Sequence, residues 1–247
     1  MNLVYVDADL LLHRAAWANT DNVEWEPGVV SIDEDLDAAQ VQFDLNLTEA
    51  LKYINYDAYV LAFSSGLNFR KRLNQSYKAN RDRTKRPGIM TALKAWAMDE
   101  YPSAMMKGLE ADDILGISGT EHKEVVMASF DKDMMSVPGR HYNWRKPALG
   151  IFQVSQRVAD LKFLEQCITG DSTDGYYGIK GLGPKKAQKI LAGATDLNDG
   201  LWRVAQAYVC RGYSYEYMLT QMRMARILRT TDWDRTTNQP KLFDPNL

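Results

Sequence analysis

Short apolar runs alternate with helical patterns over the first 155 residues of this chain. The runs Leu3–Asp7, Ala58–Phe63 and Glu124–Ser129 are rich in strand-forming residues and are predicted to be strands. Between the first two, apolar residues recur at helical spacing from Leu36 to Ile54. This alternation favours a mostly parallel central sheet flanked by helices on both faces. We therefore predict an α/β domain over residues 1–155.

Beyond residue 155 the strand signals stop, and the sequence predicts a helical domain over residues 156–247. The predicted helices are Ser155–Thr169, Lys185–Leu191, Leu197–Cys210 and Tyr213–Arg229. No stretch approaches the ~20 apolar residues of a membrane span, and the N-terminus lacks the pattern of a signal peptide. We expect a cytoplasmic protein that does not bind a membrane, with Cys167 and Cys210 as buried free thiols.

Acidic residues gather where the predicted strands end and where one helix begins. These acids are Asp7, Glu110, Asp112, Asp113, Asp131 and Asp133. Acids in the first turn of a helix are also favoured by the helix dipole, and an Asp-x-Asp sequence also marks turns. In an open α/β sheet, however, active sites collect beyond the carboxyl ends of the strands. We expect the six carboxylates to share one edge of the sheet.

A cluster of carboxylates repels itself unless cations or protons compensate the charge. Oxygen-only ligands suit Mg²⁺ or Mn²⁺, and two such ions about 4 Å apart can activate water and stabilise the leaving oxygen of a phosphodiester. The three histidines share no metal-ligand spacing, which argues against zinc. The sequence thus predicts a site for two Mg²⁺ or Mn²⁺ ions.

Two further segments have the chemistry to contact a polyanion. Gly178–Lys186 places a Gly-rich hairpin before Pro184, so that backbone N–H groups at a helix start could bind phosphate beside Lys185 and Lys186. An ordinary helix connection is the alternative. Residues 68–86 carry eight Lys or Arg against one acid, although the chain has a net charge of −2. Phe69 and Tyr77 interleave with these cations and favour contact with unpaired bases over a solvated helix face.

Five motifs together resemble the 5′-nuclease family of flap endonucleases and 5′→3′ exonucleases, especially the small exonucleases of tailed bacteriophages. The motifs are VDAD at 6–9, NFRKRLNQSYKANR at 68–81, GLEADD at 108–113, SFDKDM at 129–134 and TGDSTDGYYGIKGLG at 169–183. The resemblance implies a PIN-like nuclease domain, followed by a helix–hairpin–helix-type DNA-binding element over 165–192. It also implies cleavage near 5′ ends of duplex DNA, at a flap or nick, in phage DNA replication or degradation.

The resemblance further implies roles for individual residues. One metal ion would be held by Asp7, Glu110 and Asp112, and the other by Asp131, Asp133, Asp171 and Asp174, with Asp113 close to both. The expected catalytic residues are Arg70, reaching the scissile phosphate, together with Asp7 and Asp113. The expected DNA-binding residues are Arg70, Lys71, Tyr77, Lys78, Arg81, Gly181, Gly183, Lys185 and Lys186. The 178–183 hairpin would also offer carbonyl oxygens to a K⁺ ion.

The sequence departs from the family at one point and leaves other functions open. The family usually has an Asp after the second strand, where residues 62–66 here read Ala-Phe-Ser-Ser-Gly. The first metal would then have fewer charged ligands, unless Asp9 replaces the missing one. The alternatives are a nuclease acting on the RNA of RNA–DNA hybrids, a non-catalytic structure-selective DNA-binding protein, and an RNA-cleaving toxin. The toxin would have no reason to keep the 170–192 hairpin.

Overall fold

Strand β1 (Leu3–Asp7) lies near the middle of the central sheet. The computed structural model describes residues 2–26, 29–80 and 86–245, without the side chains of residues 22–31. Among these residues, six strands form one sheet in the order β5 (Ser103–Ala104), β4 (Ala58–Ala62), β1, β6 (Val126–Ala128), β7 (Gly139–Tyr142) and β8 (Ile151–Val154). Every pair is parallel except β7 with β8. The mostly parallel sheet predicted from the sequence is confirmed.

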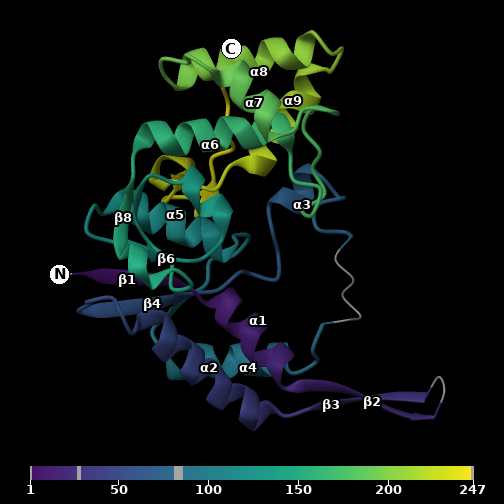
Figure 1. Ribbon diagram of the computed structural model, residues 1–247, viewed down its shortest axis with the longest axis vertical. Coiled ribbons are helices and arrows are strands. Elements are labelled where there is room, and N and C mark those ends of the chain that lie inside the picture. The colour runs from purple at the N-terminus through teal and green to yellow at the C-terminus, as the bar shows by residue number, and fades with distance from the viewer. Residues whose placement is uncertain (1, 27–28, 81–85, 246–247) are drawn as a thin grey trace.

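Alternate residues along the strands pack on opposite faces of the sheet, as the two-residue repeat of a strand requires. Val4 and Val6 of β1 pack with one core cluster, and Tyr5 with another. The first face is covered by α1 (Ala8–Ala18), α2 (Leu36–Leu51) and α4 (Met90–Glu100). Helix α5 (Ala111–Glu121) covers the other, so the domain has three layers (Figure 1).

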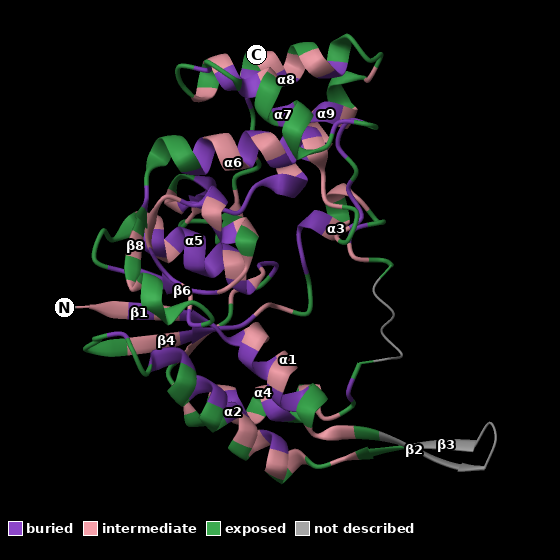
Figure 2. Ribbon diagram, in the orientation of Figure 1, coloured by how far each residue is buried: buried purple, intermediate pink, exposed green. Residues whose placement is uncertain are grey.

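Helices form most of the chain after β8. They are α6 (Gln156–Thr169), α7 (Pro184–Leu191), α8 (Leu197–Val209) and α9 (Tyr215–Ala225), and they share a core of their own. After α9 the chain returns to the sheet domain, where Ile227, Leu228 and Trp233 pack with α5. Most of α5 is therefore buried, as Figure 2 shows. The division into domains at residue 155 remains a prediction.

Several elements were not predicted from the sequence. Strands β2 (Thr20–Glu26) and β3 (Val29–Glu34) pair as a hairpin that extends away from the sheet domain (Figure 1). Acids interrupt its apolar residues, so no strand pattern was recognised. Strands β5, β7 and β8 are short, with two to four residues each. The expectation for Cys210 was wrong: Cys167 is buried, but Cys210 is exposed at the end of α8. No helix in the described ranges is long and apolar enough to cross a membrane.

Gly116→Ala tests how the returning chain packs on α5. A Cβ at Gly116 would lie 2.3 Å from the backbone oxygen of Leu228, which cannot move cheaply. Ala normally stabilises a helix interior relative to Gly by about 1 kcal/mol. We expect instead a loss of about 1–3 kcal/mol in the free energy of unfolding, as in an overpacked core. Urea unfolding measures the change.

Gly200→Ala in α8 is the matched control. Its added Cβ would meet Cδ1 of Leu164, the end of a flexible side chain, at the same 2.3 Å. The control should be less destabilised than Gly116→Ala. A stability gain in Gly116→Ala would contradict the close packing of residue 228 on this helix.

Candidate metal centre

The carboxyl ends of β1 and β6 bring two of the acidic segments together. Asp7 ends β1 and is only 3% exposed, and its Oδ2 accepts a hydrogen bond from the Ser129 hydroxyl at 3.0 Å. The same hydroxyl accepts the Asp131 N–H at 3.1 Å. Asp131 in turn accepts the Asp133 N–H at 2.8 Å, which begins a short 3₁₀ helix (Lys132–Ser136). Ser129 thus links Asp7 to the Asp131–Asp133 turn.

The N-terminus of α5 is attached to the end of β4, on the other side of β1. The Ser64 hydroxyl accepts the Ala111 N–H at 3.0 Å, and the Ser65 N–H donates to the Leu109 carbonyl at 2.8 Å. These contacts fix the start of the helix that carries Glu110 and Asp112. Three chain segments with acids therefore meet at one edge of the sheet, as the strand order predicts.

The carboxyl groups at this edge raise one another's pKa. Burial, then Asp9 and Asp131, raise the pKa of Asp7 to about 8. Burial, followed by Asp7, Asp131 and Glu110, raises the pKa of Asp112 well above its ordinary value. Burial and like charges both disfavour ionisation, and the positive charges nearby do not offset them.

The Asp131–Asp133 turn shows the same deficit of positive charge. Burial and the neighbouring Asp131 raise the pKa of Asp133 to about 6. Oδ1 of Asp133 is buried, and no donor among the described residues bonds to it. A buried acceptor without a partner is costly and is a place where an ion or water fits.

The carboxylate oxygens at this edge fit a hard divalent cation, although their side chains do not yet surround a common point. Within the described ranges, no three Asp, Glu, His or Cys side chains are arranged so that they alone could hold a metal ion. Mg²⁺ keeps several waters and usually binds one or two carboxylates. Such an ion does not need three preassembled ligands, and the unpartnered oxygen and the mutually raised pKa values match its chemistry.

Lys78 and Tyr77 join Glu110 to Asp174, two acids that were expected to serve different ions. The Lys78 ammonium lies 2.5 Å from Glu110 Oε1 and 3.6 Å from Asp174 Oδ2. The Tyr77 hydroxyl donates to Glu110 Oε2 at 2.6 Å. Burial opposes the charge of Glu110, but Lys78 and then Arg70 lower its pKa to about 2. Asp171 lies close to Asp174 in sequence, and its Oδ2 is 4.0 Å from Lys132 Nζ.

Arg70 and Asp113 pair with each other inside the protein. Both are buried and form a bidentate pair with two N–O distances of 2.8 Å. The other Arg70 contacts are Glu110 Oε2 and the carbonyls of Met224 and Arg226. A guanidinium has five N–H donors, so every one is used. Asp113 also accepts the N–H groups of Glu110 and Leu228.

That Arg70 reaches a phosphate and that Asp113 lies close to both ions remain predictions. In this structure the pair is an internal brace. It ties α3 (Arg70–Leu73), the start of α5 and the chain after α9 to one another. Sequence alone did not distinguish this arrangement, because it does not give the direction of a side chain.

The other expected DNA-binding residues divide into buried and exposed groups. Tyr77 is buried, whereas Lys78 and Lys71 are half-buried. Gly181 and Gly183 of the 178–183 hairpin are exposed, and so are Lys185 and Lys186 in the first turn of α7. Arg81 lies outside the described residues. The hairpin thus has the accessibility that contact with a large polyanion requires.

Protein donors occupy several backbone carbonyls of the hairpin. Lys186 Nζ donates to the Gly181 carbonyl at 2.9 Å, and the Tyr217 hydroxyl donates to the Gly178 carbonyl at 3.1 Å. Arg211 Nη1 donates to the Lys180 carbonyl at 3.2 Å. Pro184 is the first residue of α7, and Gly183 precedes it as the N-cap. The hairpin therefore ends at a helix N-terminus, as predicted.

Sequence analysis missed the serines that organise the site. Ser64 and Ser129 each follow a strand at the same edge, and each accepts a backbone N–H from an acid-bearing segment. A short hydroxyl side chain directly after a parallel strand was the available signal. Lys94 of α4 was also missed, and its ammonium donates to the Ser64 carbonyl.

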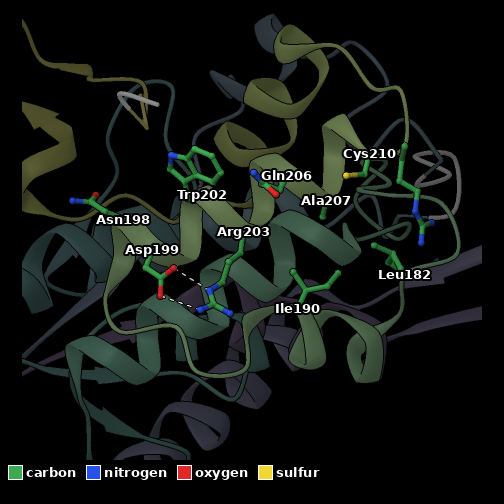
Figure 3. A pocket seen from close by; sticks show the side chains of 10 residues that line it. Leu182, Ile190, Asn198, Asp199, Trp202, Arg203, Gln206, Ala207 and Cys210 are labelled. Atoms are coloured by element: carbon green, nitrogen blue, oxygen red, sulfur yellow. Dashed lines mark hydrogen bonds and ion pairs between the residues drawn. The ribbon is translucent and has the colours of Figure 1, made fainter.

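A groove of 730 Å³ lies between α7 and α8, on the helical half of the chain (Figure 3). Trp202, Ile190 and Leu182 line it, together with the Asp199–Arg203 ion pair. Its described lining includes none of the acids expected to bind metal. The groove is therefore separate from the candidate metal centre.

The chain is similar in sequence to several known proteins. Residues 2–162 match the family described as 5′-3′ exonuclease, N-terminal resolvase-like domain. The exodeoxyribonuclease of Enterobacteria phage T3 and the exonuclease of Escherichia phage T7 are each 29% identical over 221 residues, covering 75% of this chain and 73% of theirs. DNA polymerase I of Rhizobium leguminosarum is 31% identical over 179 residues, covering 67% of this chain and 17% of that protein.

Solved structures share the fold at lower sequence identity. A bacteriophage T5 flap endonuclease in a complex with DNA and metal ions matches with a TM-score of 0.59 at 17% identity, covering 94% of this chain and 90% of that one. A second structure of the same phage protein, co-crystallised with metal ions, also matches with a TM-score of 0.59 at 15% identity.

Arg70→Met should destabilise the fold, because it leaves Asp113 as a buried charge without its partner. Breaking a buried ion pair from one side costs about 3–5 kcal/mol. Arg70→Lys should rescue little of this loss, since an ammonium has three donors for the five acceptors. Urea unfolding of both variants measures the effect. Wild-type stability in Arg70→Met, with only catalysis lost, would instead support a direct contact with substrate.

The metal-free protein should lose stability as the pH rises from about 6 to about 8. The pKa of Asp7 rises from 3.8 to about 8 on folding, so between these values the folded state holds a proton that the unfolded state has lost. The free energy of unfolding then falls with increasing pH. Urea unfolding in EDTA at the two pH values measures the slope, which Asp7→Asn should reduce. Equal or higher stability at pH 8 would contradict the raised pKa.

Proposed function

Because the chain belongs to the 5′-3′ exonuclease family, we propose that it hydrolyses phosphodiesters near free 5′ ends of duplex DNA with two divalent metal ions. Members of this family are metal-dependent nucleases that hydrolyse DNA, and the chain is an enzyme of this class. The observation that carries the proposal is that Asp7, Asp112 and Asp133, at the ends of β1 and β6 and the start of α5, have pKa values raised by burial and by neighbouring acids.

We assign the acids to two groups. Asp7, Glu110 and Asp112 would hold one ion, and Asp131, Asp133, Asp171 and Asp174 the other. When bound, the ions supply an activated water and stabilise the leaving oxygen of the phosphodiester. Mg²⁺ or Mn²⁺ suits these oxygen ligands. The metal ions in the bacteriophage T5 structures support divalent-metal dependence.

Lys78 would have two roles, one with the acids and one with the substrate. Its ammonium compensates the charges of Glu110 and Asp174 while no other cation is present. Binding of divalent ions to these acids would remove the need for that contact. Lys78 could then extend from its half-buried position to the phosphate of the substrate. Tyr77, which shares Glu110, would position the same carboxylate.

The exposed hairpin and α7 would hold the duplex through its backbone. N–H groups at a helix N-terminus favour phosphate, and Lys185 and Lys186 add positive charge. Such contacts hold DNA without reading its sequence. The DNA bound to the T5 flap endonuclease supports a DNA partner for this chain. A K⁺ ion at this hairpin would have to share the Gly181 carbonyl with Lys186.

Duplex DNA with a 5′ end, flap or nick is the substrate that we propose. The phage T3 and T7 relatives carry the names exodeoxyribonuclease and exonuclease. We also propose a role in phage DNA replication or degradation in the cytoplasm of a host cell, and that likeness supports it.

A time course on 5′-labelled and 3′-labelled duplex, with and without Mg²⁺, tests the proposed function. We expect short labelled products from the 5′ end and no cleavage in EDTA. Asp131→Asn should slow cleavage about a hundredfold or more while leaving DNA affinity intact. The reason is that losing a metal removes several kcal/mol of transition-state stabilisation, and each 1.4 kcal/mol is tenfold.

Asp196→Asn is the matched control, because Asp131 and Asp196 both cap a helix start. Asp131 accepts the Asp133 N–H at 2.8 Å, and Asp196 accepts the Asp199 N–H at 2.9 Å. Asn can make either contact, so only a metal role separates the two variants. Equal activity in both, or cleavage that proceeds in EDTA, would refute the assignment.

A further inference from the structure

Asp9 is an acid at the same edge of the sheet that neither group of proposed metal ligands includes. It is the second residue of α1, two positions after Asp7. Its side chain does not cap its own helix. Both carboxylate oxygens lie 3.3 Å from the backbone N of Ser64, which follows β4. Asp9 thus extends from α1 to the segment that follows β4.

Ser64 connects Asp9 to the acids of α5. Its backbone N–H donates to Asp9, and its hydroxyl accepts the N–H of Ala111, the residue between Glu110 and Asp112. The Asp9 carboxylate and the start of α5 are therefore held by one residue. Asp7 lies at the end of β1, the strand next to β4.

A purely structural role would explain Asp9 only in part. An acid in the first turn of a helix is favoured by the helix dipole. Lys94, whose ammonium bonds to the Ser64 carbonyl, adds a favourable charge. Asp9, however, lies only two residues from the buried carboxyl of Asp7, at the same end of β1. A second carboxylate beside a buried one costs stability unless a cation is shared between them.

We propose that Asp9 is a further ligand of the first metal ion, acting with Asp7 from the first turn of α1. The inference rests on the proposed function, because it assumes a divalent ion at this edge. It gives that site a carboxylate on the β4 side, where residues 62–66 contain no acid. The Ser64 N–H orients the Asp9 carboxylate and leaves lone pairs on both oxygens for a cation.

Asp9→Asn separates the metal role from the structural one. Asn keeps an oxygen for the Ser64 N–H but removes the negative charge. Without metal, the variant should be at least as stable as the wild type, because repulsion with Asp7 is gone. Its affinity for Mn²⁺ or Mg²⁺ should fall at least about tenfold. Loss of a residue that only hydrogen-bonds to a metal ligand already lowers metal affinity by about that factor, and loss of a ligand should lower it at least as much.

Asp37→Asn is the control, since Asp37 occupies the equivalent second position of α2 and is exposed. The measurement is thermal melting of the DNA-free protein across a Mg²⁺ titration, with binding of Mn²⁺ counted by its free-ion EPR signal. A ligand that binds only the folded state raises the melting temperature. The wild type and Asp37→Asn should share one metal dependence, and Asp9→Asn should need a higher concentration.

The possible failures are distinguishable. If Asp9→Asn keeps the wild-type metal dependence while the wild type is stabilised by metal, Asp9 is not a ligand and the proposed function stands. If Asp9→Asn instead loses as much stability without metal as Asp37→Asn does, and its metal affinity is unchanged, then Asp9 has only a structural role. The proposed function also stands in that case. If the wild type itself neither binds Mn²⁺ nor is stabilised by Mg²⁺, the metal centre and this inference both fail.

Discussion

The buried pair between Arg70 and Asp113 is the interaction on which the arrangement of the site depends. Two charges can be buried at acceptable cost only when their remaining donors and acceptors are also satisfied. Here the partners come from α3, from the start of α5 and from the chain that follows α9. The pair therefore sets where α5 begins relative to the rest of the molecule. Glu110 and Asp112 owe their place beside Asp7 to that constraint.

With the start of α5 held by this pair, the other acids of the site lie close enough together to repel one another. Parallel strands bring their carboxyl ends to one edge, and serines after β4 and β6 hold the acid-bearing segments there. The carboxyl groups so placed lack enough compensating charge, although Lys78 pairs with Glu110 and Asp174. Crowded carboxyl groups of this kind destabilise the metal-free protein, and divalent cations bound to them would relieve the repulsion. The same deficit that destabilises the fold would provide the affinity for metal.

Much of this could be predicted from the sequence, because it depends on regular patterns. The β-branched runs predicted β1, β4 and β6, and their parallel pairing places Asp7 near the Asp131–Asp133 turn. The sequence did not predict which acids face inward. Asp113 was grouped with the metal ligands because of its spacing, yet it is the third residue of α5 and turns toward Arg70. The roles of Ser64 and Asp9 depend on side-chain direction across the sheet, which spacing does not encode.

Proton release on metal binding tests most directly whether the acids are held together at the cost of their charge. Calorimetric titration of Mg²⁺ into the DNA-free protein at about pH 7, in two buffers of different ionisation enthalpy, measures it. Because the pKa of Asp7 is raised to about 8, this carboxyl holds a proton that the ion must displace. The account predicts release of about one proton or more per protein molecule, and less from Asp7→Asn. Metal binding without any proton release would show that the cluster is already ionised and would contradict the account.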